Sequence, residues 1–232
     1  MPRIERVLSK TGARRLVSET FGTFALVFAG TGAIVSNDLS GGVVTHVGIA
    51  ITFGLIVLAM IYALGDISGA HLNPAVTLGL FFAKRFDVNW VLPYIASQCL
   101  GAILASLTLR FLCPAHETLG ATLPSGSDAQ SFILEFLLTF ILMFVILRVS
   151  SPTNKQPQLG GVVIGSVVAL EALFAGPICG ASMNPARSLG PALVSMQVSS
   201  LWIYLTATCL GAVGSVYLSV FLQPANSNPS EA

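Results

Sequence analysis

Charged residues are scarce in this sequence. Only 9% of its 232 residues are Asp, Glu, Lys or Arg, and 54% are hydrophobic. An ordinary soluble domain carries roughly 25% charged residues, so the composition excludes a soluble globular protein. Long uncharged runs between the few charges predict a protein integral to a membrane.

The sequence also lacks the short alternating segments that are typical of a transmembrane β-barrel. A helix needs about 20 apolar residues to cross a bilayer, and the uncharged runs have about that length. We therefore predict an all-α membrane protein. Its six spanning helices are expected near residues 16–36, 43–65, 89–112, 131–150, 160–176 and 200–222.

Motifs for chemistry are missing as well. The sequence has no paired nucleophile and base, no glycine-rich phosphate loop and no cluster of metal ligands. Its four cysteines have neither metal-ligand spacing nor the pattern of a small disulfide-rich domain, and we interpret them as packing residues. We expect no enzyme activity, no cofactor, no metal and no nucleic-acid partner.

The basic residues predict the orientation of the chain. Cytoplasmic loops of membrane proteins carry an excess of Lys and Arg. With six spans and a cytoplasmic N-terminus, nine of the eleven basic residues fall on the cytoplasmic side: Arg3, Arg6, Lys10, Arg14, Arg15, Lys84, Arg85, Arg148 and Lys155. We therefore expect both termini in the cytoplasm.

The sequence contains an internal repeat. The stretch GAHLNPAVTLG at 69–79 recurs as GASMNPARSLG at 180–190, and Glu19 and Glu135 begin a second matched pair of short motifs. Each half, about 14–112 and 130–222, contains three spans, so the second half enters the membrane from the opposite side. We predict one transmembrane domain over 1–232, built from two inverted repeats, with a disordered tail at 223–232.

The repeated phrases predict re-entrant segments. The runs 67–83 and 177–196 are too short and too rich in Gly, Asn and Pro to span a membrane. Asn followed by Pro starts a helix, because Asn caps it and Pro fits its first position. We expect two half-helices whose positive N-terminal ends meet near Asn73 and Asn184. Gly69, Gly180 and the pair Gly176–Pro177 are expected in the irregular approaches.

These features resemble the aquaporin, or major intrinsic protein, family, whose hallmark is two Asn-Pro-Ala motifs on half-helices between six spans. The resemblance covers about residues 14–222. Among the branches of the family, the sequence looks most like the nodulin-like branch, which has bacterial members. The resemblance implies a homotetramer with one pore per subunit, in the inner (plasma) membrane of a bacterium. The pore motifs it implies are Asn73, Pro74, Ala75, Asn184, Pro185 and Ala186.

The resemblance also implies a selectivity filter formed by Phe53, Ala172, Ala181 and Arg187. An arginine in hydrocarbon costs roughly 3 kcal/mol, so we expect Arg187 to face a cavity. Water-selective relatives carry a histidine at the position of Ala172, and glycerol facilitators carry an aspartate where this chain has Ser188. We therefore expect an opening wide enough for solutes larger than water.

Four further polar residues lie in the predicted membrane region. By resemblance, Glu19 and Glu135 accept hydrogen bonds from the backbone of the re-entrant segments. His71 is interpreted either as a pore-lining residue or as a packed histidine. Glu171 has no counterpart in the other repeat, and it could pair with Arg187, face a subunit contact or bind cations at the pore mouth.

Together these observations predict a passive channel for water and small uncharged solutes, such as glycerol, urea, boric acid and arsenite. Asparagine amides and exposed carbonyls would replace the hydration of a solute, and the paired positive helix ends would exclude ions and protons. The alternative is a proton-coupled secondary transporter that uses the intramembrane glutamates, because inverted repeats with broken helices also build transporters.

Overall fold

The computed structural model describes residues 9–151 and 154–222, and the regular elements of these residues are all helical. Six helices of the described residues are long and apolar enough to cross a membrane. They are α2 (Lys10–Leu39), α3 (Thr45–Ser68), α5 (Val88–Leu112), α6 (Asp128–Val149), α7 (Gly160–Cys179) and α9 (Leu201–Phe221). The predicted six-helix membrane fold is confirmed, and the tail predicted at 223–232 lies outside the described residues.

Two short helices interrupt the series of spans. The first, α4 (Pro74–Phe82), follows α3, and the second, α8 (Pro185–Ser195), follows α7. A single 3-10 turn, η1 (Pro157–Leu159), precedes α7. With 9 and 11 residues, α4 and α8 are too short to cross about 30 Å of hydrocarbon. They are the two half-helices that the repeated Asn-Pro phrases predict.

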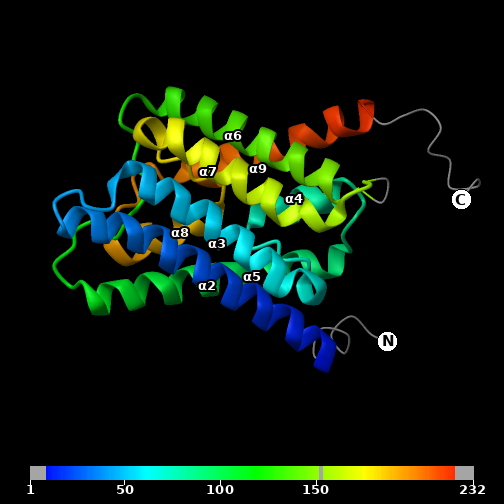
Figure 1. The fold of residues 1–232 in the computed structure, drawn as a ribbon, viewed down its shortest axis with the longest axis horizontal. Coiled ribbons are helices and arrows are strands. Elements are labelled where there is room, and N and C mark those ends of the chain that lie inside the picture. Colours follow the sequence, from blue (N-terminus) through cyan, green and yellow to red (C-terminus); the bar gives the residue numbers. More distant parts are fainter. Residues whose placement is uncertain (1–8, 152–153, 223–232) are drawn as a thin grey trace, which may run out of the picture.

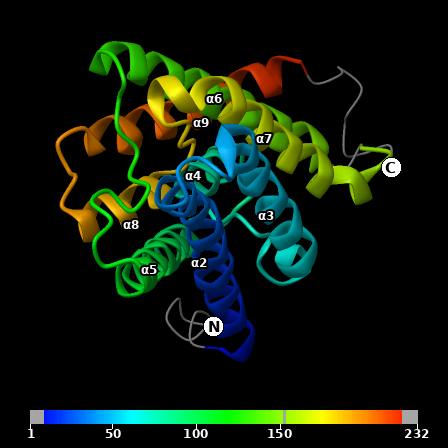
Figure 2. The same ribbon diagram turned by 60° about the vertical axis from the view of Figure 1, so that its left-hand side comes forward.

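The two halves of the chain pack in the same way (Figure 1). Helix α2 packs against α5 in the first half and α6 against α9 in the second, while α3 and α7 join the halves. Each half-helix packs chiefly against the third long helix of the opposite half, α4 against α9 and α8 against α5. Figure 2 shows α8 beside α5. The half-helices therefore bind the two repeats to each other.

Glycines allow the paired helices to approach closely. A Cβ atom added at Gly101 of α5 would lie 2.2 Å from the carbonyl oxygen of Thr20, and one at Gly211 of α9 would lie 2.2 Å from that of Phe136. Small residues permit such close backbone contact between membrane helices. Because the two contacts occupy matching places in the repeats, the same helix crossing is built twice.

The contact between the repeats is also made by glycine. A Cβ atom at Gly54 of α3 would lie 2.6 Å from the carbonyl oxygen of Gly165, and one at Gly165 of α7 would lie 2.6 Å from that of Gly54. These glycines are 111 residues apart, the same separation as Asn73 and Asn184. Gly54 and Gly165 therefore occupy matching positions in the two repeats and contact each other. Their contact marks the axis that relates the two halves.

Helix α7 differs from the sequence prediction at its C-terminal end. Gly176 and Pro177 were expected in an irregular approach, but both lie inside α7, which continues to Cys179. A proline inside a helix leaves the carbonyl four residues earlier without its usual partner. Here that carbonyl belongs to Leu173, and the Nε2 atom of His46 lies 2.7 Å from it. A side chain from the start of α3 therefore compensates for the proline.

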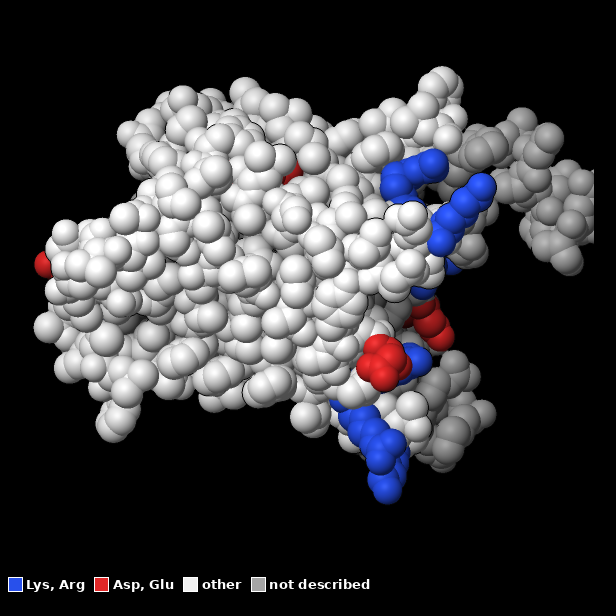
Figure 3. Space-filling view, viewed as in Figure 1, with Lys and Arg blue, Asp and Glu red and all other residues white. Residues whose placement is uncertain are grey.

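The ends of the bundle differ in charge. Helix α2 starts and α9 ends at the same end of the molecule (Figure 1). Figure 3 shows that the lysines and arginines of this face gather there, and little charge is visible along the sides of the long helices. The sides are instead covered by apolar residues, many of them exposed. This is the surface that a lipid bilayer requires.

We expect Gly211→Ala to lower stability, because the new methyl group would overlap the backbone of Phe136 and force the α6 and α9 helices apart. Overpacking of this kind costs about 1–3 kcal/mol. The midpoint of thermal unfolding of the purified protein in detergent measures the effect. Gly214→Ala is the matched control on α9, because its Cβ would make only an ordinary contact, 3.5 Å from Phe136. Equal losses in the two variants would contradict the prediction.

Candidate functional site

The half-helices begin at the two Asn-Pro-Ala motifs. The Oδ1 atom of Asn73 accepts a hydrogen bond from the backbone N–H of Ala75 at 2.8 Å, and that of Asn184 accepts from Ala186 at 3.0 Å. In each helix the proline of the motif is the first helical residue, where a missing N–H leaves no bond unmade. Both helices therefore direct their positive ends toward the motifs.

The two motifs are joined by an exchange of hydrogen bonds. The Nδ2 atom of Asn73 donates to the carbonyl of Met183 at 2.7 Å, and that of Asn184 donates to the carbonyl of Leu72 at 2.8 Å. Each asparagine thus caps its own half-helix and holds the segment that leads into the other one. The exchange fixes the two positive helix ends close together inside the bundle.

The backbone that leads into each half-helix is strained. Ala70 and Leu72 have φ angles of 46° and 53°, and Ala181 and Met183 have φ angles of 40° and 54°. The left-handed region costs a residue with a Cβ atom roughly 1–2 kcal/mol. The same costly conformation occurs at matching positions of both repeats, so each segment needs contacts that hold it in place.

Two buried carboxylates provide those contacts. Glu19 of α2 and Glu135 of α6 are both 0% exposed. Each accepts hydrogen bonds from two consecutive backbone N–H groups of one re-entrant segment, and such charge-assisted bonds are the strong ones. The donors and distances are His71 (3.0 Å) and Leu72 (2.8 Å) for Glu19, and Ser182 (2.8 Å) and Met183 (2.9 Å) for Glu135. The carboxylates therefore satisfy backbone groups that no helix satisfies.

Three more polar side chains complete this support. The hydroxyl groups of Tyr94 and Tyr204 donate at 2.8 Å to the carbonyl of the last residue of α3 and of α7, respectively. The Nε2 atom of Gln98 donates at 2.8 Å to Glu19. The sequence prediction missed these roles, although the two tyrosines belong to the matched repeats and Gln98 is an isolated amide in an apolar span. Those two signals could have identified them.

Arg187 follows the second motif and is 3% exposed. Its Nη1 atom donates to the carbonyl of Gly120 at 2.8 Å, and its guanidinium carbon lies 5.0 Å from the ring centroid of Phe53. Within residues 9–151 and 154–222, no carboxylate forms an ion pair with it. The buried charge is therefore held by a carbonyl and an aromatic face.

A cavity of about 820 Å³ connects these groups. Its lining includes the four predicted filter residues and both motif asparagines, namely Phe53, Ala172, Ala181, Arg187, Asn73 and Asn184. Residues from the end of the molecule where α2 begins also line it, among them Asp66, Arg85, Asn154 and Gln158. The cavity thus extends from that end of the bundle, past the paired motifs, to the buried arginine.

The two residues with open interpretations differ in their surroundings. His71 lines the cavity and is also packed, with its ring 4.6 Å from that of Phe86 and 5.0 Å from that of Tyr94. Glu171 is 1% exposed, does not line this cavity, and has no hydrogen-bond partner for either carboxylate oxygen. Glu171 therefore does not pair with Arg187 in the described structure.

Comparisons with known proteins agree with this geometry. The family model described as major intrinsic protein matches residues 6–218. The chain is 47% identical to aquaporin NIP1-1 of Oryza sativa subsp. japonica over 88% of this chain and 72% of that relative, and 42% identical to nodulin-26 of Glycine max over 93% and 80%. The aquaglyceroporin structure from Plasmodium falciparum superimposes with a TM-score of 0.80 at 28% identity, covering 89% of this chain and 94% of the other.

The chain therefore belongs to the major intrinsic protein family. Within that family it is similar to the aquaporins of the nodulin-like branch. It is an integral membrane protein and a channel for water and small solutes.

We expect Glu135→Gln to destabilise the protein and to reduce water permeation. One acceptor oxygen becomes an NH₂ group that faces a backbone N–H, and a buried donor left without a partner costs about 1–3 kcal/mol. Thermal unfolding in detergent and water permeability in vesicles measure the two effects. Glu171→Gln is the matched control, because it alters a buried carboxylate that has no bond to lose. A larger loss of stability in the control would contradict the supporting role.

Proposed function

We propose that the channel conducts water and small uncharged polar solutes by passive diffusion and rejects ions and protons. The proposal rests chiefly on one observation, the composition of the cavity lining, which combines two asparagine side chains, two strained backbone segments and one buried guanidinium. Amide N–H groups are donors and carbonyl groups are acceptors. A neutral solute that loses its hydration shell can therefore replace both kinds of hydrogen bond along the lining.

Rejection of cations follows from the fixed positive charge along this path. Two half-helices direct their N-terminal ends toward the motifs, and each end carries about half an elementary charge. Arg187 adds a further positive charge, and in the described residues no carboxylate forms an ion pair with it. A cation or hydrated proton at these places has a raised energy, while a neutral molecule does not.

The solute range follows from the residues assigned to the filter, Phe53, Ala172, Ala181 and Arg187. One aromatic wall, one charged donor and two methyl-sized side chains leave more room than a filter with an imidazole at position 172. Compact neutral molecules with several hydroxyl or amide groups fit such an opening, and glycerol, urea, boric acid and undissociated arsenite are of this kind. The similarity to a structure described as an aquaglyceroporin supports this range.

A proton-coupled transporter is the weaker candidate. Glu19 and Glu135 occupy matching positions and accept backbone hydrogen bonds, which suits fixed supports of the two segments. Glu171 is buried away from the cavity lining. A carboxylate that carries protons across a membrane needs access to a water-filled path, and the arrangement of these three residues favours a channel.

The assembly and orientation complete the proposal. Family membership supports a homotetramer of this single domain, residues 1–232, with one pore in each subunit. The excess of Lys and Arg at the end where α2 begins supports a cytoplasmic position for that end and for both termini. A bacterial inner membrane is the compartment that we propose.

We expect vesicles that contain the protein to shrink and re-swell faster than empty vesicles in gradients of glycerol, urea and boric acid, and to respond faster to a water gradient. Stopped-flow light scattering measures all four rates on one preparation. Planar-bilayer recording of the same preparation should give no current. Uptake of solute against its gradient that stops on addition of an uncoupler would favour the transporter instead.

We expect Ala172→His to lower the glycerol permeability more than the water permeability, because the imidazole narrows the opening and adds a donor that binds water. The ratio of the two permeabilities in vesicles measures the change. Ala172→Leu is the control for size, since it adds similar bulk without a polar group, and it should reduce both permeabilities. An unchanged ratio in Ala172→His would remove this residue from the filter.

A further inference from the structure

The loop between α5 and α6, residues 113–127, reaches from the end of the bundle into the site. Leu119 is 0% exposed, although it lies in this connecting loop. The carbonyl of Gly120 accepts the hydrogen bond from Arg187, and the hydroxyl of Thr122 donates to that of Ser188 at 2.8 Å. The loop therefore contacts the buried arginine and the residue that follows it.

The part of the loop that holds Arg187 has a strained backbone. Leu119 and Gly120 have φ angles of 52° and 72°. A Cβ atom at Gly120 would lie 2.9 Å from Thr31 of α2, so the loop is also pressed against the bundle at this point. Leu119 is an unfavourable residue for the left-handed region, and the position of the Gly120 carbonyl depends on contacts that keep this turn in place.

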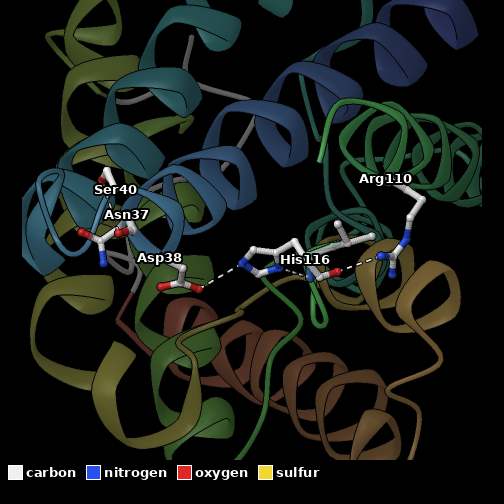
Figure 4. Close-up of polar contacts among 6 residues, drawn as sticks. Asn37, Asp38, Ser40, Arg110 and His116 are labelled. Carbon is white, nitrogen blue, oxygen red and sulfur yellow. Dashed lines mark hydrogen bonds and ion pairs between the residues drawn. The ribbon is translucent and has the colours of Figure 1, made fainter. Parts of the chain in front are cut away.

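His116 supplies a side-chain contact to this turn (Figure 4), in addition to the backbone hydrogen bond from Ala121 to Thr118. Its Nδ1 atom accepts the backbone N–H of Leu119 at 3.0 Å, and its Nε2 atom lies 3.2 Å from the Oδ2 atom of Asp38 at the end of α2. Its own carbonyl accepts a hydrogen bond from Arg110 of α5 at 2.7 Å. The imidazole is 8% exposed and thus joins two helices to the turn from a nearly buried position.

We propose that His116 is a positioning residue for the selectivity filter, which holds the Gly120 carbonyl against Arg187 and releases it when the imidazole is protonated. This inference rests on the filter role proposed above for Arg187. The path consists of three contacts in sequence, from Asp38 to His116, from His116 to Leu119, and from Gly120 to Arg187.

The bonding pattern sets the sign of the pH effect. Because Nδ1 accepts from a backbone N–H, a neutral His116 carries its proton on Nε2 and donates it to Asp38. A second proton can bind only at Nδ1, where it would face the N–H of Leu119, so two donors would oppose each other. Protonation of His116 at Nδ1 therefore breaks the hydrogen bond to the turn.

The charged groups around His116 act in both directions. Asp38 is 51% exposed on its side chain and favours the protonated imidazole, although solvent screens it. Glu117, the next residue in the loop, is exposed, so solvent screens its charge. Arg110, which is hydrogen-bonded to the carbonyl of His116, opposes protonation.

Two substitutions of His116 separate its functions. An asparagine at this position can still accept the N–H of Leu119 through its Oδ1 atom, but it does not titrate. An alanine removes the acceptor altogether. His116→Ala should therefore change the ratio of glycerol to water permeability at about pH 7.5 by on the order of fivefold, the factor that one hydrogen bond supplies. His116→Asn should keep the neutral-pH ratio and lose its dependence on pH.

The test measures water and glycerol permeability of reconstituted protein at about pH 7.5 and about pH 5.5, for the wild type and three variants. Glu117→Gln is the matched control, because it removes a loop charge that has no hydrogen bond among the described contacts, and it should behave as the wild type. A wild type whose ratio in acid shifts toward that of His116→Ala supports the inference.

Several results would overturn the inference. One is a His116→Ala protein with the wild-type ratio and pH profile; another is a His116→Asn protein that keeps the wild-type pH profile. The second result decides the case even if His116→Ala does not fold. A wild type that conducts no glycerol at either pH would instead contradict the proposed solute range, so the two proposals fail in different measurements.

Discussion

The structure depends on one constraint, the need to satisfy backbone N–H and C=O groups at membrane depth. Two segments of this chain, 69–73 and 180–184, leave the helical conformation inside the bundle, and hydrocarbon offers no partner for the groups that they expose. Glu19 and Glu135 bind their N–H groups, and the motif asparagines bind two of their carbonyls. The six long helices surround this polar centre and separate it from lipid.

The same constraint explains why the buried polar residues occur in matched pairs. A carboxylate, a tyrosine and an asparagine serve each re-entrant segment, at corresponding positions of the two repeats. Arg187 breaks the symmetry, because the first repeat has Val76 at the matching position. The support of Arg187 comes from the loop between α5 and α6, which lies between the repeats.

Much of the fold could be predicted from the sequence, because its causes are local. Runs of apolar residues fix the spans, and Asn followed by Pro fixes the start of each half-helix. The extent of α7 could not be predicted from the sequence. Pro177 leaves the carbonyl of Leu173 without a helical donor, and the side chain that binds this carbonyl, His46, lies 127 residues away in the sequence. The role of His116 escaped for the same reason, since Asp38 is 78 residues away in sequence. A contact between residues that are distant in the sequence cannot be predicted from the pattern of neighbouring residues.

The exchange of half-helices between the repeats has a consequence for biosynthesis. Helix α4 packs chiefly against α9, which leaves the ribosome after the other five described spans. The first re-entrant segment is therefore translated before α9, its main packing partner. Until α9 is made, α4 lacks this packing surface. Assembly of the conducting path is thus a late, cooperative event that neither repeat can accomplish alone, and a chain that stops before Leu201 lacks the surface on which α4 comes to rest.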